Sequence, residues 1–248
     1  DIDDPQTYIN DDKYVAQEKK DGERRPVKSN GEGGKGIVIG FNKKGNQVPL
    51  PTCIVDAIKY FNVTVDGEII GDKFYVFDLL SFNGSSYLEQ RYNSRLIILE
   101  GLHFGTSIEV VKTARTREQK QKMYDDLVKN NAEGIVFKLA DAPYTAGRPN
   151  SGGAQLKNKF YTEATFIVSS HTKGKRSVGL ELINEQGERV GVGKVTIPPN
   201  KDVPKIGDFV EVKYLYAYRG GAIFQSEYKW KRKDCDLTDV TTKQLKYK

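Results

Sequence analysis

The stretch 16-AQEKKDGERR-25 gathers lysines, acids and arginines around one Asp-Gly pair, Asp21 and Gly22. Such a concentration of charge has two interpretations. It can be a solvated turn between two strands, or it can surround a lysine that acts as a nucleophile. These ten residues alone leave both interpretations open, so the rest of the chain has to decide between them.

Composition limits the class of protein. The chain has 248 residues, enough for one large domain or two smaller ones, and it is 38% hydrophobic with 14 Tyr and 11 Phe. Its mean hydropathy is -0.58, and no apolar run approaches the roughly 18 residues that a membrane-spanning helix needs. We therefore expect no membrane association. A net charge of +6 favours a polyanionic partner.

The first part of the chain mixes strand and helix patterns. Apolar residues at positions 54, 55, 58 and 61 have helical spacing. We expect further helices over 85–102 and 116–131, and strands over 13–20, 35–41, 63–70, 73–80 and 132–140. The glycine-rich stretch 29-SNGEGGKG-36 is interpreted as the tip of a hairpin.

From about Thr162 the pattern changes to strands separated by turns. The segments 164–171, 178–197, 207–218 and 222–233 supply five short strands with almost no helix signal, which suits a small closed barrel of the OB-fold type. We therefore predict an α+β chain with a first domain over 1–161, built of antiparallel sheets with flanking helices. An all-β OB-fold domain over 162–248 follows it.

The charged stretch has the form Lys19-x-Asp21-Gly22-x-Arg24. A lysine attacks phosphorus only as the neutral amine, so its ordinary pKa of about 10.4 has to be lowered by cationic neighbours or partial burial. Lys20, Arg24 and Arg25, or a bound metal, are placed to do this.

Three more segments carry matching chemistry. The segment 65-VDGEI-69 is a second Asp-Gly-acid turn, and 155-QLKNKF-160 holds Lys157 and Lys159 two residues apart, on one face of a strand. In 133-EGIVFK-138, Glu133 and Lys138 are five residues apart and would face opposite ways in a regular strand. Twist or a bulge at the start of the strand could direct both into one cleft.

Taken in the order of the chain, these motifs resemble those of the covalent nucleotidyltransferases and, among them, the ATP-dependent DNA ligases. The resemblance covers nearly the whole chain and implies a nucleotidyltransferase (adenylation) domain before the OB-fold. It makes Lys19 the catalytic residue that becomes adenylylated, and Glu68 and Glu133 the metal ligands. Phe77, in 75-YVFDLLSFNG-84, would stack on adenine. The residues that it assigns to the nucleotide are Gln17, Glu18, Arg24, Lys43, Glu68, Phe77, Lys138, Lys157, Lys159, Arg232 and Asp234.

Three positions depart from the family pattern. Arg232-Lys233-Asp234 is similar to an Arg-x-Asp-Lys motif that orients the leaving pyrophosphate, but Cys235 stands where the last lysine is expected. Asn42-Lys43 replaces a ribose-binding Ser-Arg pair, and Gln155-Leu156 stands in place of the usual tryptophan. Pyrophosphate handling would therefore differ or depend on Lys233.

The resemblance implies an enzyme that seals nicks in duplex DNA through a lysyl-AMP intermediate and a 5′-adenylylated DNA intermediate. Its cofactors would be ATP and Mg²⁺, with Mn²⁺ able to substitute, and its partner nicked double-stranded DNA. We expect a minimal, two-domain monomer in the cytoplasm of a bacterial cell or a phage-infected host cell.

Two alternatives stay open. One is another enzyme of the same superfamily, an RNA ligase or an mRNA-capping guanylyltransferase. The other is a non-catalytic nucleic-acid-binding protein whose OB barrel carries the function. Taken singly, Lys19 is an ordinary surface charge and Phe77 an ordinary core aromatic. Only their occurrence together in order favours the enzyme.

Overall fold

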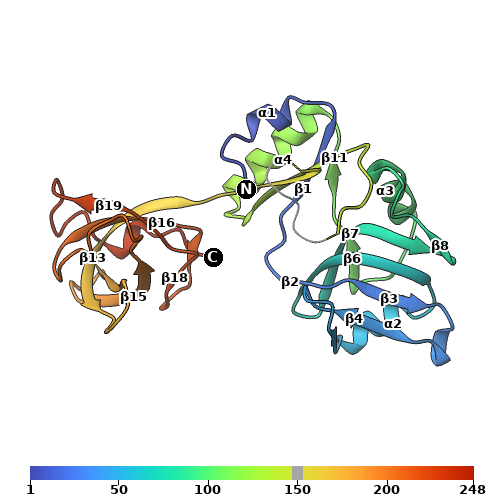
Figure 1. The fold of residues 1–248 in the computed structure, drawn as a ribbon, viewed down its shortest axis with the longest axis horizontal. Helices are drawn as coiled ribbons and strands as arrows, with labels where there is room; N and C mark the ends of the chain where they lie inside the picture. The colour runs from blue at the N-terminus through green and yellow to red at the C-terminus, as the bar shows by residue number, and fades with distance from the viewer. Residues whose placement is uncertain (147–152) are drawn as a thin grey trace. The chain divides into compact units, whose positions relative to one another are not determined.

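The computed structural model describes residues 1–146 and 153–248 (Figure 1). The chain divides into two compact units, Asp1–Asn158 and Lys159–Lys248. The boundary lies close to the one expected from the change in pattern near Thr162. No helix of the described residues is long and apolar enough to cross a membrane.

The first unit contains two mainly antiparallel sheets. The smaller has the order β10 (Thr113–Ala114), β1 (Tyr14–Glu18), β11 (Gly134–Leu139) and β12 (Gln155–Lys159). The larger has the order β5 (Gln47–Val48), β4 (Val38–Phe41), β3 (Val27–Asn30), β6 (Asn62–Ile70), β7 (Lys73–Phe82) and β8 (Ser85–Ser86). Two short strands extend it: β2 (Glu23–Arg24) pairs with β6, and β9 (Ile108–Val110) pairs with β7 in parallel.

Alternation along the strands explains how the larger sheet holds a core. Phe74, Val76 and Leu79 on β7 are fully buried together with Val65 on β6 and Ile54 on the helix α2 (Thr52–Ile58). Phe77, between the buried positions, is only partly buried. Phe74 and Val76 share one face by alternation, and the register shift that skips Phe77 returns Leu79 to that face, so Phe77 is left for the opposite one. The hairpin predicted at 29–36 is confirmed, because it joins the antiparallel β3 and β4 through the 3-10 turn η1 (Gly33–Lys35).

The structure confirms the predicted helices, but one of them begins later than expected and one short helix was not predicted. The helix α4 (Arg117–Lys129) begins with a capping box in which Thr116 accepts from the backbone of Gln119. The helix predicted over 85–102 is wrong at its beginning: α3 covers only Tyr92–Glu100. Residues 85–86 pair with β7 as β8, and Arg91 has an extended backbone, so the helix starts after it. A four-residue helix, α1 (Gln6–Ile9), was not predicted.

The second unit is a curled antiparallel sheet of five strands. Its order is β15 (Arg189–Thr196), β14 (Ser177–Ile183), β13 (Thr162–His171), β16 (Phe209–Tyr214) and β19 (Glu227–Arg232). Register shifts in the β13–β14, β14–β15 and β16–β19 pairings mark bulges that increase curvature. The edge strands β15 and β19 also lie beside each other, as in a barrel. A small hairpin of β17 (Tyr216–Ala217) and β18 (Ile223–Phe224) completes it.

Candidate active site

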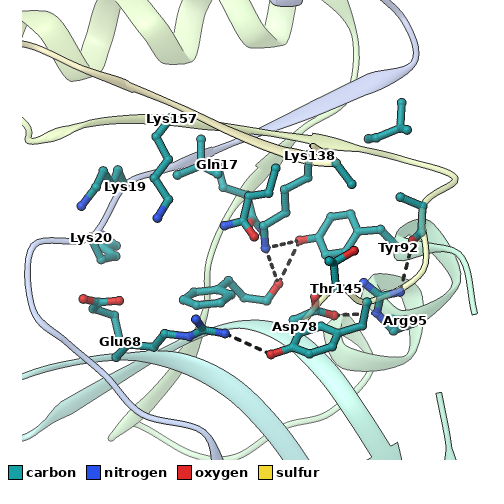
Figure 2. Close-up of a pocket in the computed structure, with 18 of the residues that line it drawn as sticks. Gln17, Lys19, Lys20, Glu68, Asp78, Tyr92, Arg95, Lys138, Thr145 and Lys157 are labelled. Carbon is teal, nitrogen blue, oxygen red and sulfur yellow. Dashed lines mark hydrogen bonds and ion pairs between the residues drawn. The ribbon is translucent and has the colours of Figure 1, made fainter. Parts of the chain in front are cut away.

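A pocket opens in the first unit between its two sheets. Gln17 and Glu18 on β1 and Lys138 on β11 line it from the smaller sheet, and Arg24 on β2 and Phe77 on β7 line it from the larger. Figure 2 shows two ends of this pocket: Lys19, Lys20, Glu68 and Lys157 gather at one, and Tyr92, Asp78 and Arg95 at the other. Half of the charged stretch 16–25 therefore lines the pocket: Gln17, Glu18, Lys19, Lys20 and Arg24.

Lys19 lies directly after β1 and is paired with a buried carboxylate. Its backbone N–H donates to the carbonyl of Gly134 at 2.9 Å, which continues the β1–β11 ladder. Its Nζ lies 2.5 Å from Oε2 of Glu133, whose side chain is 4% exposed. Since β11 begins at Gly134, Glu133 precedes the regular alternation of the strand. Glu133 thus meets Lys19 while Lys138 of the same segment lines the pocket.

Glu68 supplies a second carboxyl at this end. It lies on β6, beside the bulge between Asp66 and Gly67. Burial raises the pKa of Glu68 to about 7, with the charges of Glu133 and Asp66 adding to the effect and Lys19 opposing it. The carboxyl group of Glu68 is therefore close enough to both Lys19 and Glu133 for their charges to influence one another.

The glycine between these acids is required by close packing. A Cβ at Gly67 would lie 2.5 Å from the carbonyl oxygen of Tyr75 and 2.4 Å from the ring of Phe74. Only glycine lets β6 approach β7 this closely while Glu68 stays on the pocket side.

The inner part of the pocket is aromatic and holds a buried lysine. Nζ of Lys138 donates to the carbonyl of Phe77 at 3.0 Å and to Oη of Tyr92 at 3.3 Å. It also lies 4.5 Å from the centroid of each of these two rings. Burial lowers the pKa of Lys138 to about 8. The partly exposed ring of Phe77 provides an apolar wall for a flat ligand.

Two arginine–aspartate pairs support the wall formed by the larger sheet. Nε and Nη2 of Arg24 donate to the carboxylate of Asp66 at 3.1 and 2.6 Å. Arg95 on α3 donates to both oxygens of Asp78 at 2.8 and 3.1 Å, and both of these residues are buried. Such bidentate pairs fix the plane of the guanidinium relative to that of the carboxylate.

Sequence reasoning missed Tyr92, Arg95, Asp78 and Tyr144, which all line the pocket. Tyr92 and Arg95 occupy the buried face of α3 together with Leu96 and Leu99. Their spacing was visible as an ordinary core pattern, which hides a polar role. Asp78 and Tyr144 carried no local signal that distinguishes them from other strand and loop residues.

Of the other first-unit residues predicted to bind the nucleotide, Gln17, Glu18 and Lys157 line the pocket and Lys43 does not. Lys157 lines the pocket, Gln17 donates to Oγ1 of Thr113 at 2.9 Å, and Glu18 accepts from Lys20 at 2.5 Å. The structure does not bring Lys43 to this pocket: it is exposed in the turn between β4 and β5.

The remaining predicted residues belong to the second unit. Lys159 is its first residue and donates to Gln225 at 3.1 Å. Arg232 and Asp234 form a bidentate pair at 3.0 and 2.7 Å, and Arg232 also contacts Glu211 at 3.3 Å. The neighbouring Cys235 places its sulfur 3.7 Å from Asp234.

The donor set at the Lys19 end fits a hard divalent cation. Glu68 and Glu133 offer carboxylate oxygens, the ligands that Mg²⁺ prefers. Among the described residues no cluster of three or more His, Cys, Asp or Glu could hold a metal ion. A cation here would therefore keep water or substrate oxygens as its other ligands, as Mg²⁺ usually does.

Comparison with solved structures defines the class of fold. A Lig E DNA ligase, studied for DNA binding with a minimal scaffold, superposes with a TM-score of 0.69 at 19% identity, over 93% of this chain and 96% of that one. The ligase domain of LigD from M. tuberculosis superposes with a TM-score of 0.53 at 20% identity, over 92% of each chain. The chain thus has the fold of a nucleotidyltransferase domain followed by that of an OB-fold domain, which confirms the predicted fold class.

Comparison of sequences shows which family part of the chain resembles. Residues 70–159 match the family described as ATP dependent DNA ligase domain. A probable DNA ligase of Dictyoglomus turgidum is 29% identical over 130 residues, 51% of this chain and 22% of that protein. A DNA ligase of Nanoarchaeum equitans is 24% identical over 184 residues, 69% of this chain and 32% of that protein. The matches span only about a fifth to a third of these relatives, and they confirm the resemblance to ATP-dependent DNA ligases.

Proposed function

We propose that this protein is an ATP-dependent DNA ligase that seals nicks in duplex DNA. One observation carries the proposal. Lys19, Glu68, Glu133 and Lys157, which are far apart in the sequence, meet at one end of a pocket whose other wall includes the partly exposed ring of Phe77. This arrangement fits a nucleoside triphosphate, with the base against the aromatic wall and the phosphates at the charged end.

The reaction proceeds through the amine of Lys19. Its lone pair attacks the α-phosphorus of ATP, the bond to the bridging oxygen breaks, and pyrophosphate leaves as the nitrogen loses its proton. Glu133, 2.5 Å from Nζ, orients the amine and is within reach of this proton. AMP then passes from Lys19 to the 5′-phosphate of the nick, and the 3′-hydroxyl displaces AMP to close the strand.

The other pocket residues stabilise charge. Lys157 offers a fixed positive charge to the α-phosphate oxygens, on which negative charge builds at each step. Glu68 and Glu133 would hold Mg²⁺, which when bound supplies further positive charge to the phosphate oxygens. Phe77 stacks on adenine, and Arg24 binds the nucleotide from the larger sheet.

The nucleic-acid substrate follows from charge and fold. A chain of net charge +6 that carries an OB-fold suits a phosphate backbone. Since contacts between cationic side chains and phosphates release bound counterions, binding should weaken steeply as salt rises, and it should show no base preference. We further infer a monomer that acts in the cytoplasm of a bacterial cell or a phage-infected host.

The test is incubation with each α-³²P-labelled nucleoside triphosphate and Mg²⁺, followed by a denaturing gel and a sealing assay on nicked duplex DNA. We expect a covalent label from ATP and closure of the nick. A label from GTP without one from ATP would indicate a capping guanylyltransferase, and sealing of RNA but not DNA an RNA ligase. Absence of any covalent label would favour the non-catalytic binding protein.

A further inference from the structure

Tyr144 makes contacts that the proposed chemistry does not yet use. Its hydroxyl donates to Oδ2 of Asp66 at 3.0 Å and accepts from Nη2 of Arg24 at 3.0 Å. Asp66 is 1% exposed, whereas the side chain of Arg24 is 38% exposed and lines the pocket. One phenol therefore contacts both members of an ion pair that reaches from the buried sheet to the pocket.

The backbone that presents this hydroxyl is itself held at several points. The N–H of Tyr144 donates to the carbonyl of Leu88 at 2.8 Å. Two residues earlier, the carbonyl of Ala142 accepts from the N–H of Tyr92 at 2.9 Å and from Nη1 of Arg95 at 3.3 Å. The segment after β11 is thus tied to α3 and to the residues before it, so the hydroxyl has a defined position.

The protonation state of Tyr144 suits this position. Burial, together with the charge of Asp66, raises the pKa of Tyr144 to about 12. The phenol stays neutral in physiological conditions and can donate to Asp66 while it accepts from Arg24. Nη2 of Arg24 is shared between Asp66 and Tyr144, and among the described residues Nη1 of Arg24 has no hydrogen-bond partner.

We propose that Tyr144 is a positioning residue that fixes the plane of the Arg24 guanidinium so that its remaining donors meet the bound nucleotide. This inference rests on the proposed function. Without the hydroxyl, Arg24 keeps its two bonds to Asp66 but loses the contact that limits rotation of the pair. A flexible cation binds a fixed ligand less tightly than a preorganised one.

The experiment compares Tyr144→Phe with the wild type, with Tyr60→Phe at an exposed tyrosine as the matched control. We expect Tyr144→Phe to raise the apparent KM for ATP in self-adenylylation about 10-fold. The limiting rate should stay within about 2-fold, because Lys19 and Glu133 are untouched. Tyr60→Phe should change neither, and melting temperatures show whether all variants are folded.

A double variant separates positioning of Arg24 from any other role. In the Arg24→Lys background the planar fork is absent, so the effect of adding Tyr144→Phe should fall to less than about 2-fold. An unchanged KM in Tyr144→Phe, a loss confined to the limiting rate, or an equal effect in both backgrounds would overturn the inference.

A binding measurement keeps this result distinct from failure of the proposed function. Titration of ATP into each protein in EDTA measures nucleotide affinity without chemistry. If the wild type does not become labelled but Tyr144→Phe still weakens ATP binding about 10-fold, the positioning role stands and the ligase proposal fails. Equal affinities for ATP would remove the positioning role regardless of activity.

Discussion

Glu68 shows how a single side chain at this site affects stability. Burial raises its pKa to about 7 from an ordinary 4.5. Between these pH values the folded protein holds a proton that the unfolded chain has lost. Stability therefore falls as pH rises through this window, and the full penalty is present above about 7.

Replacing Glu68 by glutamine removes this penalty. In metal-free buffer, Glu68→Gln should be more stable than the wild type by ~1–2 kcal/mol near pH 8. The difference should shrink towards pH 4.5. Urea unfolding at a series of pH values measures it, with Glu185→Gln at an exposed position as control. A difference between Glu68→Gln and the wild type that does not vary with pH would contradict the raised pKa.

The role of a single residue could be predicted only where its partners are close to it in the sequence. Lys19, Asp21 and Gly22 stand in one short motif, so their joint role could be proposed from spacing. Tyr144 acts only through Arg24 and Asp66, which are 120 and 78 positions away. Such contacts depend on how β2, β6 and the segment after β11 come together, which no local pattern reports.

At the scale of elements, α4 is attached to the start of β1 by one buried lysine. Nζ of Lys120 donates to the carbonyls of Tyr8, Asp11 and Tyr14 at 3.0, 2.7 and 2.9 Å, and its side chain is buried. These three bonds join α4 to α1 and to the strand that leads to Lys19.

Lys120→Met should destabilise the protein by ~2–3 kcal/mol, because three carbonyls lose a charged donor inside the protein. Lys129→Met, at an exposed position of the same helix, should change stability by less than ~0.5 kcal/mol. The free energy of unfolding in urea gives both values. Equal effects of the two substitutions would show that the bonds of Lys120 contribute little.

Helices with regular apolar spacing were predicted well, whereas the pairing of strands with one another was not. The helix expected over 116–131 matches α4 closely, and the structure shows that it begins at the capping residue Thr116. The start of α3 was misplaced because residues 85–86 pair with Ser81 and Phe82 of β7. This tertiary contact overrode a sequence pattern that otherwise continued as a helix.

At the scale of the whole molecule, the second unit carries the motif that contains Arg232 and Asp234. In the structure these residues bind each other and Arg232 also contacts the buried Glu211. The OB-fold was predictable from five short strands, because each strand is a local pattern bounded by turns.

If Arg232 has the pyrophosphate role that the resemblance implies, Arg232→Ala should lower adenylylation from ATP about 100-fold, because a cation that faces the departing pyrophosphate is lost. The variant should still close a nick whose 5′-phosphate already carries AMP, since pyrophosphate has left by then. Both activities are measured on the same preparation, with its melting temperature compared with the wild type. Adenylylation at the wild-type rate would contradict the pyrophosphate role that the resemblance implies for Arg232.

The account as a whole depends on Lys19 as the nucleophile. The most direct measurement is mass spectrometry of the protein and its peptides after incubation with ATP and Mg²⁺. We predict one AMP on Lys19, none on Lys19→Ala, and none on Lys19→Arg, because a guanidinium does not deprotonate near neutral pH. Lys20→Ala should keep the adduct on Lys19. An AMP group found on Lys19→Ala, or on another residue of the wild type in place of Lys19, would contradict the central claim.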